Sequence, residues 1–319
     1  MTSSAFELIS RAERALVLGI GGGGDVVGSL AVARLCESLG TPFELGGVAW
    51  ERFVVDPYPG PRPLEQTRGG RLLGDGALLG DAGTTTADGV AFSEARMAEH
   101  LGRATVLVDV SEGPRIAAEG IATAAGELGC DLALYVDVGG DALARGDEPG
   151  LASPLCDAVM LAAAELAADR VTPLGAIFGV GCDGELTSAE VLARIAELAA
   201  ARAWLGAWAM PPAIADELEA AATRVPTEAS LQAVRCARGE IGEAPIREGR
   251  RSVELGPLGA LTFFFDVRAA FAAALPLARA VAGANGLDPA DETLAALGVR
   301  SELAYERSRA AETGRASSG

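Results

Sequence analysis

Short apolar runs alternate with helical patterns over the first 210 residues of the chain. The run ALVLGI at 15–20 is typical of a buried strand, and residues 26–39 repeat apolar positions at helical spacing. The same alternation predicts strands at 42–50, 104–110, 131–138 and 173–180 and helices at 92–102, 114–129, 153–169 and 187–206. Strands that alternate with helices form parallel sheets through right-handed crossovers. We therefore predict an α/β fold with a doubly wound, mostly parallel, Rossmann-like sheet.

Two of these helices start with capping signals. Ser153 precedes Pro154, which pairs a favoured N-cap residue with a favoured first helical residue. Thr187 and Glu190 have the spacing of a capping box. Both helices are expected to begin at these residues.

The pattern changes after residue 210. Two helical segments lead to a stretch at 244–266 that is typical of short antiparallel strands with glycine-rich turns, and two further helices close the fold. These helices are predicted at 213–223, 228–238, 268–282 and 288–297. We divide the chain into a core at 1–210, a small C-terminal α+β addition at 211–305 and a disordered tail at 306–319.

Residues 56–90 are rich in proline and glycine and interrupt the core with a long irregular excursion. Irregular segments of that length are typical of lids over a binding site or of mobile loops. The sequence does not decide between these two interpretations.

Composition and charge narrow the class of protein. Half of the 319 residues are hydrophobic, which supports a sizeable core. No apolar run reaches the length of a membrane span, and the N-terminus lacks a signal-peptide pattern, so we expect a cytoplasmic protein with no membrane partner. The net charge of −18 and the lack of a basic cluster argue against nucleic acid. The expected partner is a small-molecule substrate, and a homo-oligomer is left open.

The number and spacing of cysteine and histidine residues argue against several kinds of structural and catalytic site. The five cysteines are widely spaced without a CxxC motif, and the chain has one histidine. These features disfavour a disulfide framework, a zinc centre and a Ser-His-Asp triad. Cys182 is either a nucleophile or a packed thiol, and His100 is either a base or the polar end of a helix.

The residues that follow the predicted strands combine glycine with carboxylates. In chain order the strands are followed by Gly21, Gly22, Gly23 and Gly24 with Asp25; by Glu51 with Arg52; by Asp109 and Glu112; by Asp137, Gly139, Gly140 and Asp141 with Glu148 beyond; and by Gly181, Asp183 and Glu185. Ligands of open parallel sheets bind outside the carboxyl ends of the strands. The sequence therefore predicts that these loops surround one pocket.

Glycines at that edge let the backbone approach a ligand, and the following helix directs N–H groups at it. Crowded carboxylates repel each other and any phosphate unless a divalent cation lies between them. The predicted cofactor is Mg²⁺, with Asp25, Asp137, Asp141 and Glu148 as ligands. The predicted catalytic residues are Asp25, Asp141, Asp183 and Glu185. The predicted ligand-binding backbone is that of Gly21, Gly22, Gly23, Gly24, Gly139, Gly140 and Gly181.

A second interpretation of the first glycine loop is a dinucleotide site. Gly19, Gly21 and Gly24 fit the spacing of the dinucleotide fingerprint, and Glu44 lies 20 residues beyond the last of them. Glu44 is expected inside a strand, however, and Asp25 would oppose a bare pyrophosphate. Four consecutive glycines also satisfy many patterns.

Five segments, taken in order, resemble the archaeal and bacterial family known as domain of unknown function 1152. They are GIGGGGDVVG, GGVAWERFVVDPYPGPRP, DVGGDALARGDEPGLASPLCDAVML, GVGCDGELT and TEAS. The resemblance spans roughly residues 12–270. It implies that these segments are shared motifs of the family, and it carries no activity.

The favoured function is that of a small-molecule enzyme. Clustered Asp and Glu would support metal-assisted hydrolysis or group transfer on a nucleotide, nucleoside or phosphorylated metabolite. Arg247, Arg250 and Arg251 either clamp an anionic group of such a substrate or are solvated surface charge. The alternatives are an NAD(P)- or FAD-dependent oxidoreductase and a non-catalytic ligand sensor.

Overall fold

Five parallel strands form the centre of the protein, whose computed structural model describes residues 3–312. They are β1 (Ala15–Gly19), β2 (Phe43–Val48), β7 (Thr105–Val108), β8 (Leu132–Val138) and β9 (Thr172–Phe178). The strands lie in the order β7-β2-β1-β8-β9. They are almost fully buried, and strands covered on both faces read as continuous apolar runs because neither face meets water. The predicted doubly wound α/β sheet is confirmed.

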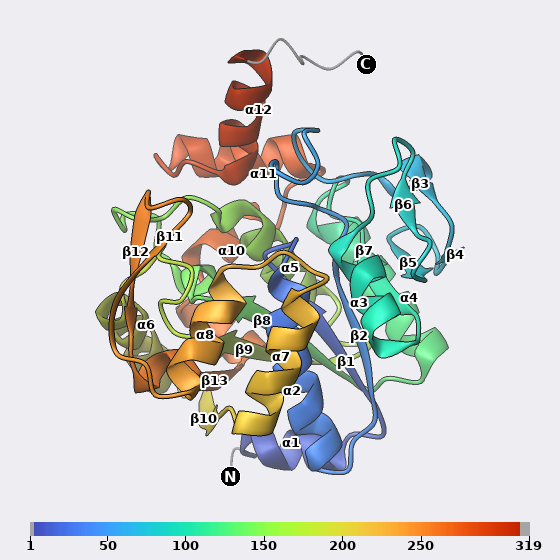
Figure 1. The fold of residues 1–319 in the computed structure, drawn as a ribbon. Helices are drawn as coiled ribbons and strands as arrows, with labels where there is room; N and C mark the ends of the chain where they lie inside the picture. The colour runs from blue at the N-terminus through green and yellow to red at the C-terminus, as the bar shows by residue number, and fades with distance from the viewer. Residues whose placement is uncertain (1–2, 313–319) are drawn as a thin grey trace.

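Helices cover both faces of this sheet (Figure 1). One face carries α1 (Ala5–Arg11), α2 (Asp25–Ser38), α3 (Ser93–Leu101), α7 (Pro212–Ala222) and α8 (Ala229–Ala237). The other carries α4 (Pro114–Leu128), α5 (Pro154–Leu166), α6 (Ser188–Ala200), α9 (Val267–Ala273), α10 (Pro276–Val281) and α11 (Leu287–Ala296). The apolar core therefore consists of two layers with the sheet between them.

Antiparallel strands extend the sheet beyond β9. β13 (Leu261–Asp266) pairs with β9, and β10 (Trp204–Ala209) pairs with β13. The C-terminal segment thus contributes a strand to the central sheet as well as a peripheral addition. Sequence analysis had joined residues 204–206 to the preceding helix, but the two-residue alternation of exposure along β10 is that of a half-buried strand.

The excursion at 56–90 contains regular structure. It holds the short helix η1 (Leu64–Gln66) and the strands β3 (Thr67–Arg68), β4 (Arg71–Leu72), β5 (Ala77–Gly80) and β6 (Thr85–Thr86). β5 pairs antiparallel with β7, and β4 pairs with β5, so they form the other edge of the central sheet. The prediction of a wholly irregular segment was wrong, because strands of two to four residues are too short to show a periodicity.

The C-terminal part also adds a separate hairpin. β11 (Gly242–Ile246) and β12 (Arg251–Leu255) form the predicted antiparallel pair, and the short helix η3 (Pro257–Ala260) follows. The helix predicted at 268–282 is divided into α9 and α10 before Pro276, since proline cannot donate the hydrogen bond that would continue a helix.

The last described element is α12 (Glu302–Glu312), which projects from the body at the top of Figure 1. Residues 306–312 are helical, so the prediction of a disordered tail was wrong for them. Its remaining residues, 313–319, lie outside the described part of the chain. Within residues 3–312, no helix combines the length and the apolar character needed to cross a bilayer.

The two capping predictions had different outcomes. Thr187 and Glu190 form the expected capping box at the start of α6. Ser153 occupies the N-cap position of α5, but its side chain makes no capping bond. The carboxylate of Glu302 instead accepts hydrogen bonds from the N–H groups of Leu155 and Cys156, at 3.1 and 2.7 Å. The cap of α5 is therefore supplied by α12.

Candidate functional site

The candidate site lies where the winding of the sheet changes direction. Numbered in chain order, the five parallel strands run 3-2-1-4-5 across the sheet, so consecutive connections diverge between β1 and β8. A crevice forms outside the carboxyl ends of the two diverging strands, and ligands of such sheets bind there. The loops after β1, β8 and β9 all reach this point.

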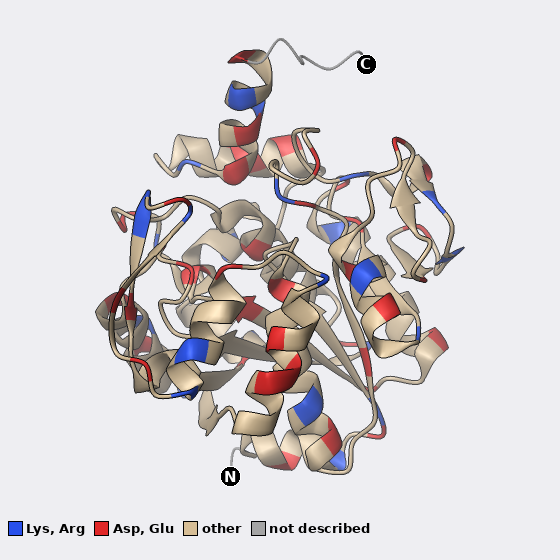
Figure 2. Ribbon diagram, in the orientation of Figure 1, with Lys and Arg blue, Asp and Glu red and all other residues tan. Residues whose placement is uncertain are grey.

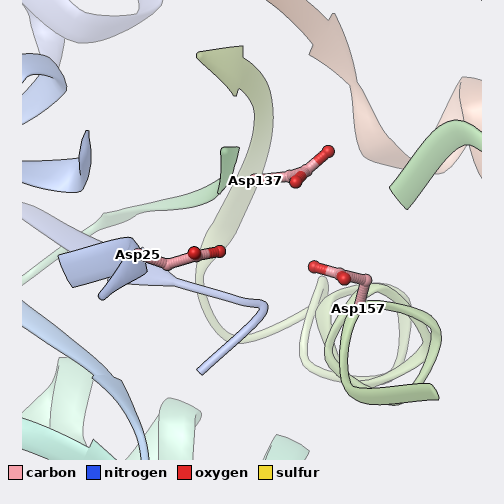
Figure 3. Close-up of side chains that lie close together, drawn as sticks. All are labelled: Asp25, Asp137 and Asp157. Carbon is pink, nitrogen blue, oxygen red and sulfur yellow. The ribbon is translucent and has the colours of Figure 1, made fainter. Parts of the chain in front are cut away.

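Three buried carboxylates converge in this crevice (Figure 3). Asp25 begins α2, Asp137 lies near the end of β8 and Asp157 lies in the first turn of α5. One carboxylate oxygen from each lies within 4.8 Å of the others. They come from three elements, so only the tertiary structure brings them together.

A second group of three carboxylates lies beside the first. Asp141 begins the short helix η2 (Asp141–Leu143), and Asp183 and Glu185 lie in the loop after β9. Their oxygens are also within 4.8 Å of one another. Besides burial, the negative charges of Asp137 and Asp157 raise the pKa of Asp141, so the two groups act on each other electrostatically. We call the six residues the acidic cluster: Asp25, Asp137, Asp141, Asp157, Asp183 and Glu185.

Two carboxylate oxygens of the acidic cluster lack a hydrogen-bond partner. They are Oδ1 of Asp157 and Oδ1 of Asp183, and both are buried. Glu185 differs, since it accepts hydrogen bonds from the N–H groups of Ala152 and Ser153 at 2.7 and 2.8 Å and from the Ser153 hydroxyl at 2.6 Å. A buried polar atom without a partner is costly. The two orphaned oxygens are therefore free to bind a cation.

The protein environment favours the neutral form of these carboxyls. Burial raises the pKa of Asp25 to about 6 and that of Asp183 to about 7. The pKa values of Asp137, Asp141 and Asp157 are raised well above their usual range, first by burial and then by neighbouring carboxylates. Desolvation and like charge act in the same direction here. A bound cation would reverse both effects.

Three arginines lie close to the acidic cluster. Burial alone would lower the pKa of Arg52, but the carboxylates of Asp25 and Glu185 outweigh it, so this pKa is raised. Arg251 forms an ion pair with Glu185, with Nη1 and Oε1 3.3 Å apart. Arg247 lies at the turn of the β11–β12 hairpin, where basic residues gather (upper left in Figure 2). Arg250 shares that turn but is exposed.

The seven predicted glycines lie in the loops around this region, and Gly21 is the one of them that lines its cavity. The N–H of Gly21 donates to Oδ2 of Asp25 at 3.0 Å, so the side chain of Asp25 occupies the loop that was expected to hold an anion. A Cβ on Gly139 would lie 2.2 Å from Cγ of Asp183, so glycine is required for the loops after β8 and β9 to approach. Gly22 borders Trp50, Gly23 borders Arg52 and Gly24 borders Thr227. In the later loops, Gly140 borders Val191 and Gly181 borders Ser188.

Together these groups enclose a cavity of about 10 Å³. Its walls include Asp25, Arg52, Asp183 and Arg247, with Ala229 of α8 on one side. A cavity of this size has room for about one water molecule or ion. The loops after β1, β8 and β9 line this cavity together with Arg52, whereas Glu51, Asp109 and Glu112 do not, so the prediction that all five strand-end loops surround one pocket was wrong for the loop after β7.

Other candidates from the sequence lie elsewhere. Glu148 accepts hydrogen bonds from the backbone N–H groups of Arg145 and Gly146 and belongs to neither group of three. Glu44 pairs with Arg14 and Arg103 near the start of β2, at the opposite end of the strands from the glycine loop.

The remaining candidate groups also face away from the cavity. The thiol of Cys182 hydrogen-bonds Cys236, which together with burial raises the pKa of Cys182 and makes it a poor nucleophile. His100 lies in the last turn of α3. Asp109 and Glu51, which end β7 and β2, bind backbone and serine groups.

Sequence reasoning missed two residues of this site: Asp157 and Glu302. Asp157 stands inside the apolar run LCDAVML, and a lone carboxylate in a buried helix is the signal that was available. Arg52 was placed at the end of its strand beside Glu51, but no role was predicted for it. Glu302 carries no local signal, because its role as the cap of α5 depends on a contact between distant segments.

Comparison with protein families identifies the family of this chain. The family described as Protein of unknown function (DUF1152) matches residues 16–310, and the chain belongs to this family. Comparison with curated proteins and with solved structures gives no match.

Proposed function

Starting from that family membership, which by itself assigns no activity, we propose that this protein is a metal-dependent hydrolase or transferase. Its substrate is a nucleotide, nucleoside or phosphorylated metabolite that reacts at the β1–β8 crevice. The observation that carries this proposal is the pairing of two groups of three buried carboxylates with two orphaned oxygens. Such an arrangement is unfavourable alone and favourable with bound divalent cations.

The donor set fits a hard cation. All six ligand candidates supply carboxylate oxygens, and no cysteine or histidine belongs to either group. Oxygen ligands suit Mg²⁺, Ca²⁺ and Mn²⁺. Asp25, Asp137 and Asp157 would hold such an ion, or Asp141, Asp183 and Glu185 would, because the cavity has room for about one ion. Bound Mg²⁺ supplies neutralisation of developing negative charge and a water molecule of lowered pKa.

The chain's own residues would divide the remaining work. Asp183 has a buried oxygen without a partner, which suits it to bind the cation directly. Glu185 positions Ser153 and the start of α5 through its three hydrogen bonds. The Gly21–Asp25 hydrogen bond holds the glycine loop against the ligands.

The dinucleotide-dependent alternative gains no support from the geometry. The N–H of Gly21, which would face a pyrophosphate, is directed at Asp25, and Glu44 is engaged in ion pairs away from the loop. A non-catalytic sensor would use the same pocket and differs by the absence of turnover.

The test is a thermal-shift screen of the chelator-treated protein. Nucleotides, nucleosides and sugar phosphates are added with and without Mg²⁺, and hits are assayed for turnover. We expect Mg²⁺ alone to raise the melting temperature and turnover to require it. Absence of any Mg²⁺ effect in the wild type, or stabilisation by NAD(P) without metal, would contradict the proposal.

A further inference from the structure

Two arginines lie above the acidic cluster without a close carboxylate partner. Arg52 follows β2 and Arg247 lies in the β11–β12 turn, and both side chains line the cavity that Asp25 also lines. In the described part of the chain, the guanidinium of Arg52 has neither a hydrogen bond nor an ion pair. The ion pair of Arg247 is loose, with Nη1 3.7 Å from Oε2 of Glu228. The donors of both side chains are therefore available to a ligand.

The guanidinium groups of Arg52 and Arg247 repel each other electrostatically. The pKa of Arg247 is lowered, first by burial and then by the positive charge of Arg52. Two cations that share a small cavity repel, just as the carboxylates below them do. An anion between the arginines would relieve the first repulsion, and cations among the carboxylates would relieve the second. The cavity is thus polarised into a negative floor and a positive rim.

Arg247 is also held in a strained backbone conformation. Its φ angle is 52°, and that of the next residue, Glu248, is 58°. Both residues belong to the four-residue loop between the paired residues Ile246 and Arg251, and residues other than glycine, asparagine and aspartate seldom adopt such φ angles. A large side chain kept in the left-handed region is found where the side chain has a task. Nothing in the packing of the turn requires an arginine, because the side chain extends toward the cavity instead of the hairpin.

We propose that Arg52 and Arg247 together bind a phosphoryl group of the substrate at the rim of the cavity, directly above the metal-binding carboxylates. This inference rests on the proposed function and narrows it: the substrate is a phosphate ester or anhydride, and unphosphorylated nucleosides are not bound. Guanidinium groups offer paired N–H donors that match phosphate oxygens, and two of them balance a dianion.

The size of the cavity determines where the cation and the phosphoryl group bind. A volume of about 10 Å³ admits ions or a water and not a nucleotide. One cation occupies the floor, the phosphoryl group lies at the rim between the arginines, and the rest of the substrate extends outward past the hairpin turn. This arrangement places the reacting phosphorus next to the carboxylates without direct contact between like charges.

The experiment measures Mg²⁺ and pyrophosphate binding by calorimetry in four full-length proteins. These are the wild type, Arg52→Gln, Arg247→Gly and the control Arg250→Gln, which changes an exposed arginine of the same turn. We expect pyrophosphate affinity in the presence of Mg²⁺ to fall at least about tenfold in the first two variants and to stay unchanged in the control. Affinity for Mg²⁺ alone should be unchanged or higher in both, since a nearby positive charge is removed.

Arg247→Gly keeps the test valid if Arg52→Gln fails to fold. Glycine adopts the φ angle of this position without strain, so the melting temperature of this variant should be unchanged or higher while pyrophosphate binding weakens. A residue with a merely structural role would show the opposite result.

The possible failures are distinct. If the wild type binds Mg²⁺ and all four proteins bind pyrophosphate equally or not at all, the arginine site is refuted and the metal site stands. If the wild type binds no Mg²⁺ but binds pyrophosphate through Arg52 and Arg247, the proposed function is refuted and the arginine site stands.

Discussion

The same edge of the sheet carries two buried acidic regions that differ in how their charges are satisfied. At the ends of β2 and β7, Asp56 and Arg62 form a two-bond ion pair of 2.7 and 2.8 Å, and Asp109 accepts hydrogen bonds from the N–H groups of Leu64 and Ser111. We call Asp56, Arg62 and Asp109 the paired network. The acidic cluster at the β1–β8 crevice is equally buried, yet two of its carboxylate oxygens have no hydrogen-bond partner.

This contrast separates carboxylates that hold the fold from carboxylates that await a ligand. Both regions follow strands and look alike in sequence, so position at a strand end is not a sufficient criterion. The decisive quantity is the balance of partners around each buried oxygen. Mutations should therefore affect folding stability in the paired network and ligand binding in the acidic cluster.

The largest effect on stability is expected in the paired network. Arg62→Gln leaves the carboxylate of Asp56 buried without its partner, which costs about 3–5 kcal/mol. Urea unfolding at pH 7.5 measures this loss, with Arg71→Gln as the control because its ion pair with Glu127 is exposed. A loss in Arg62→Gln no larger than that of the control would remove the distinction between the two regions.

The largest effect on binding is expected from Asp157→Asn. It removes a charged ligand with an orphaned oxygen, and Mg²⁺ affinity should fall at least about 100-fold, or about 2.7 kcal/mol. The metal-free variant should be as stable as the wild type or more so, because a like charge is gone. Calorimetry and thermal melting measure these two quantities.

The control for that variant is Glu148→Gln. Glu148 was predicted from the sequence to be a metal ligand, but in the structure it lies outside both groups of three carboxylates. The Mg²⁺ affinity of this control should equal that of the wild type. A metal-free Asp157→Asn protein that is much less stable, together with unchanged Mg²⁺ binding, would assign Asp157 to the fold.

The pH dependence of folding stability should differ in sign between the metal-free and the metal-bound acidic cluster. The pKa values of Asp25 and Asp183 rise from 3.8 to about 6 and about 7 on folding. The folded state then binds more protons than the unfolded state between these limits. The two groups therefore contribute most to the free energy of unfolding below pH 3.8. Their contribution falls as pH rises toward 7, by up to about 1.4 kcal/mol per pH unit for each group.

Saturating Mg²⁺ should abolish or reverse that slope, because ligand carboxylates must lose their protons. Unfolding free energies of the metal-free protein at pH 5 and 8, compared with those of Asp183→Asn, isolate the contribution of this group. A slope as large in the variant as in the wild type would show that Asp183 does not titrate in this range.

The smallest effect is expected from Thr187→Ala. Thr187 follows Glu185 by two residues but acts in the capping box of α6, so the substitution should cost about 1 kcal/mol. Mg²⁺ affinity should not change. A decrease in that affinity would mean that the loop after β9, and not the carboxylates themselves, controls metal binding.

The sequence by itself determined the order of the core elements and the edge of the sheet where the site lies. Apolar runs and helical repeats are local patterns, and the rule that ligands bind at the carboxyl ends of parallel strands turns them into a location. Asp25, Asp141 and Asp183 could be predicted in this way, because each follows a strand within a few residues.

Only the tertiary structure decided which charged groups meet there. Asp157 enters from the first turn of a helix, Arg52 and Arg247 approach from segments almost 200 residues apart, and Glu302 caps α5 from a region predicted in part to be disordered. These contacts join distant segments and leave no periodic trace in either one. The balance of charge around a buried oxygen depends on all of its neighbours at once, so it exists only in the folded chain.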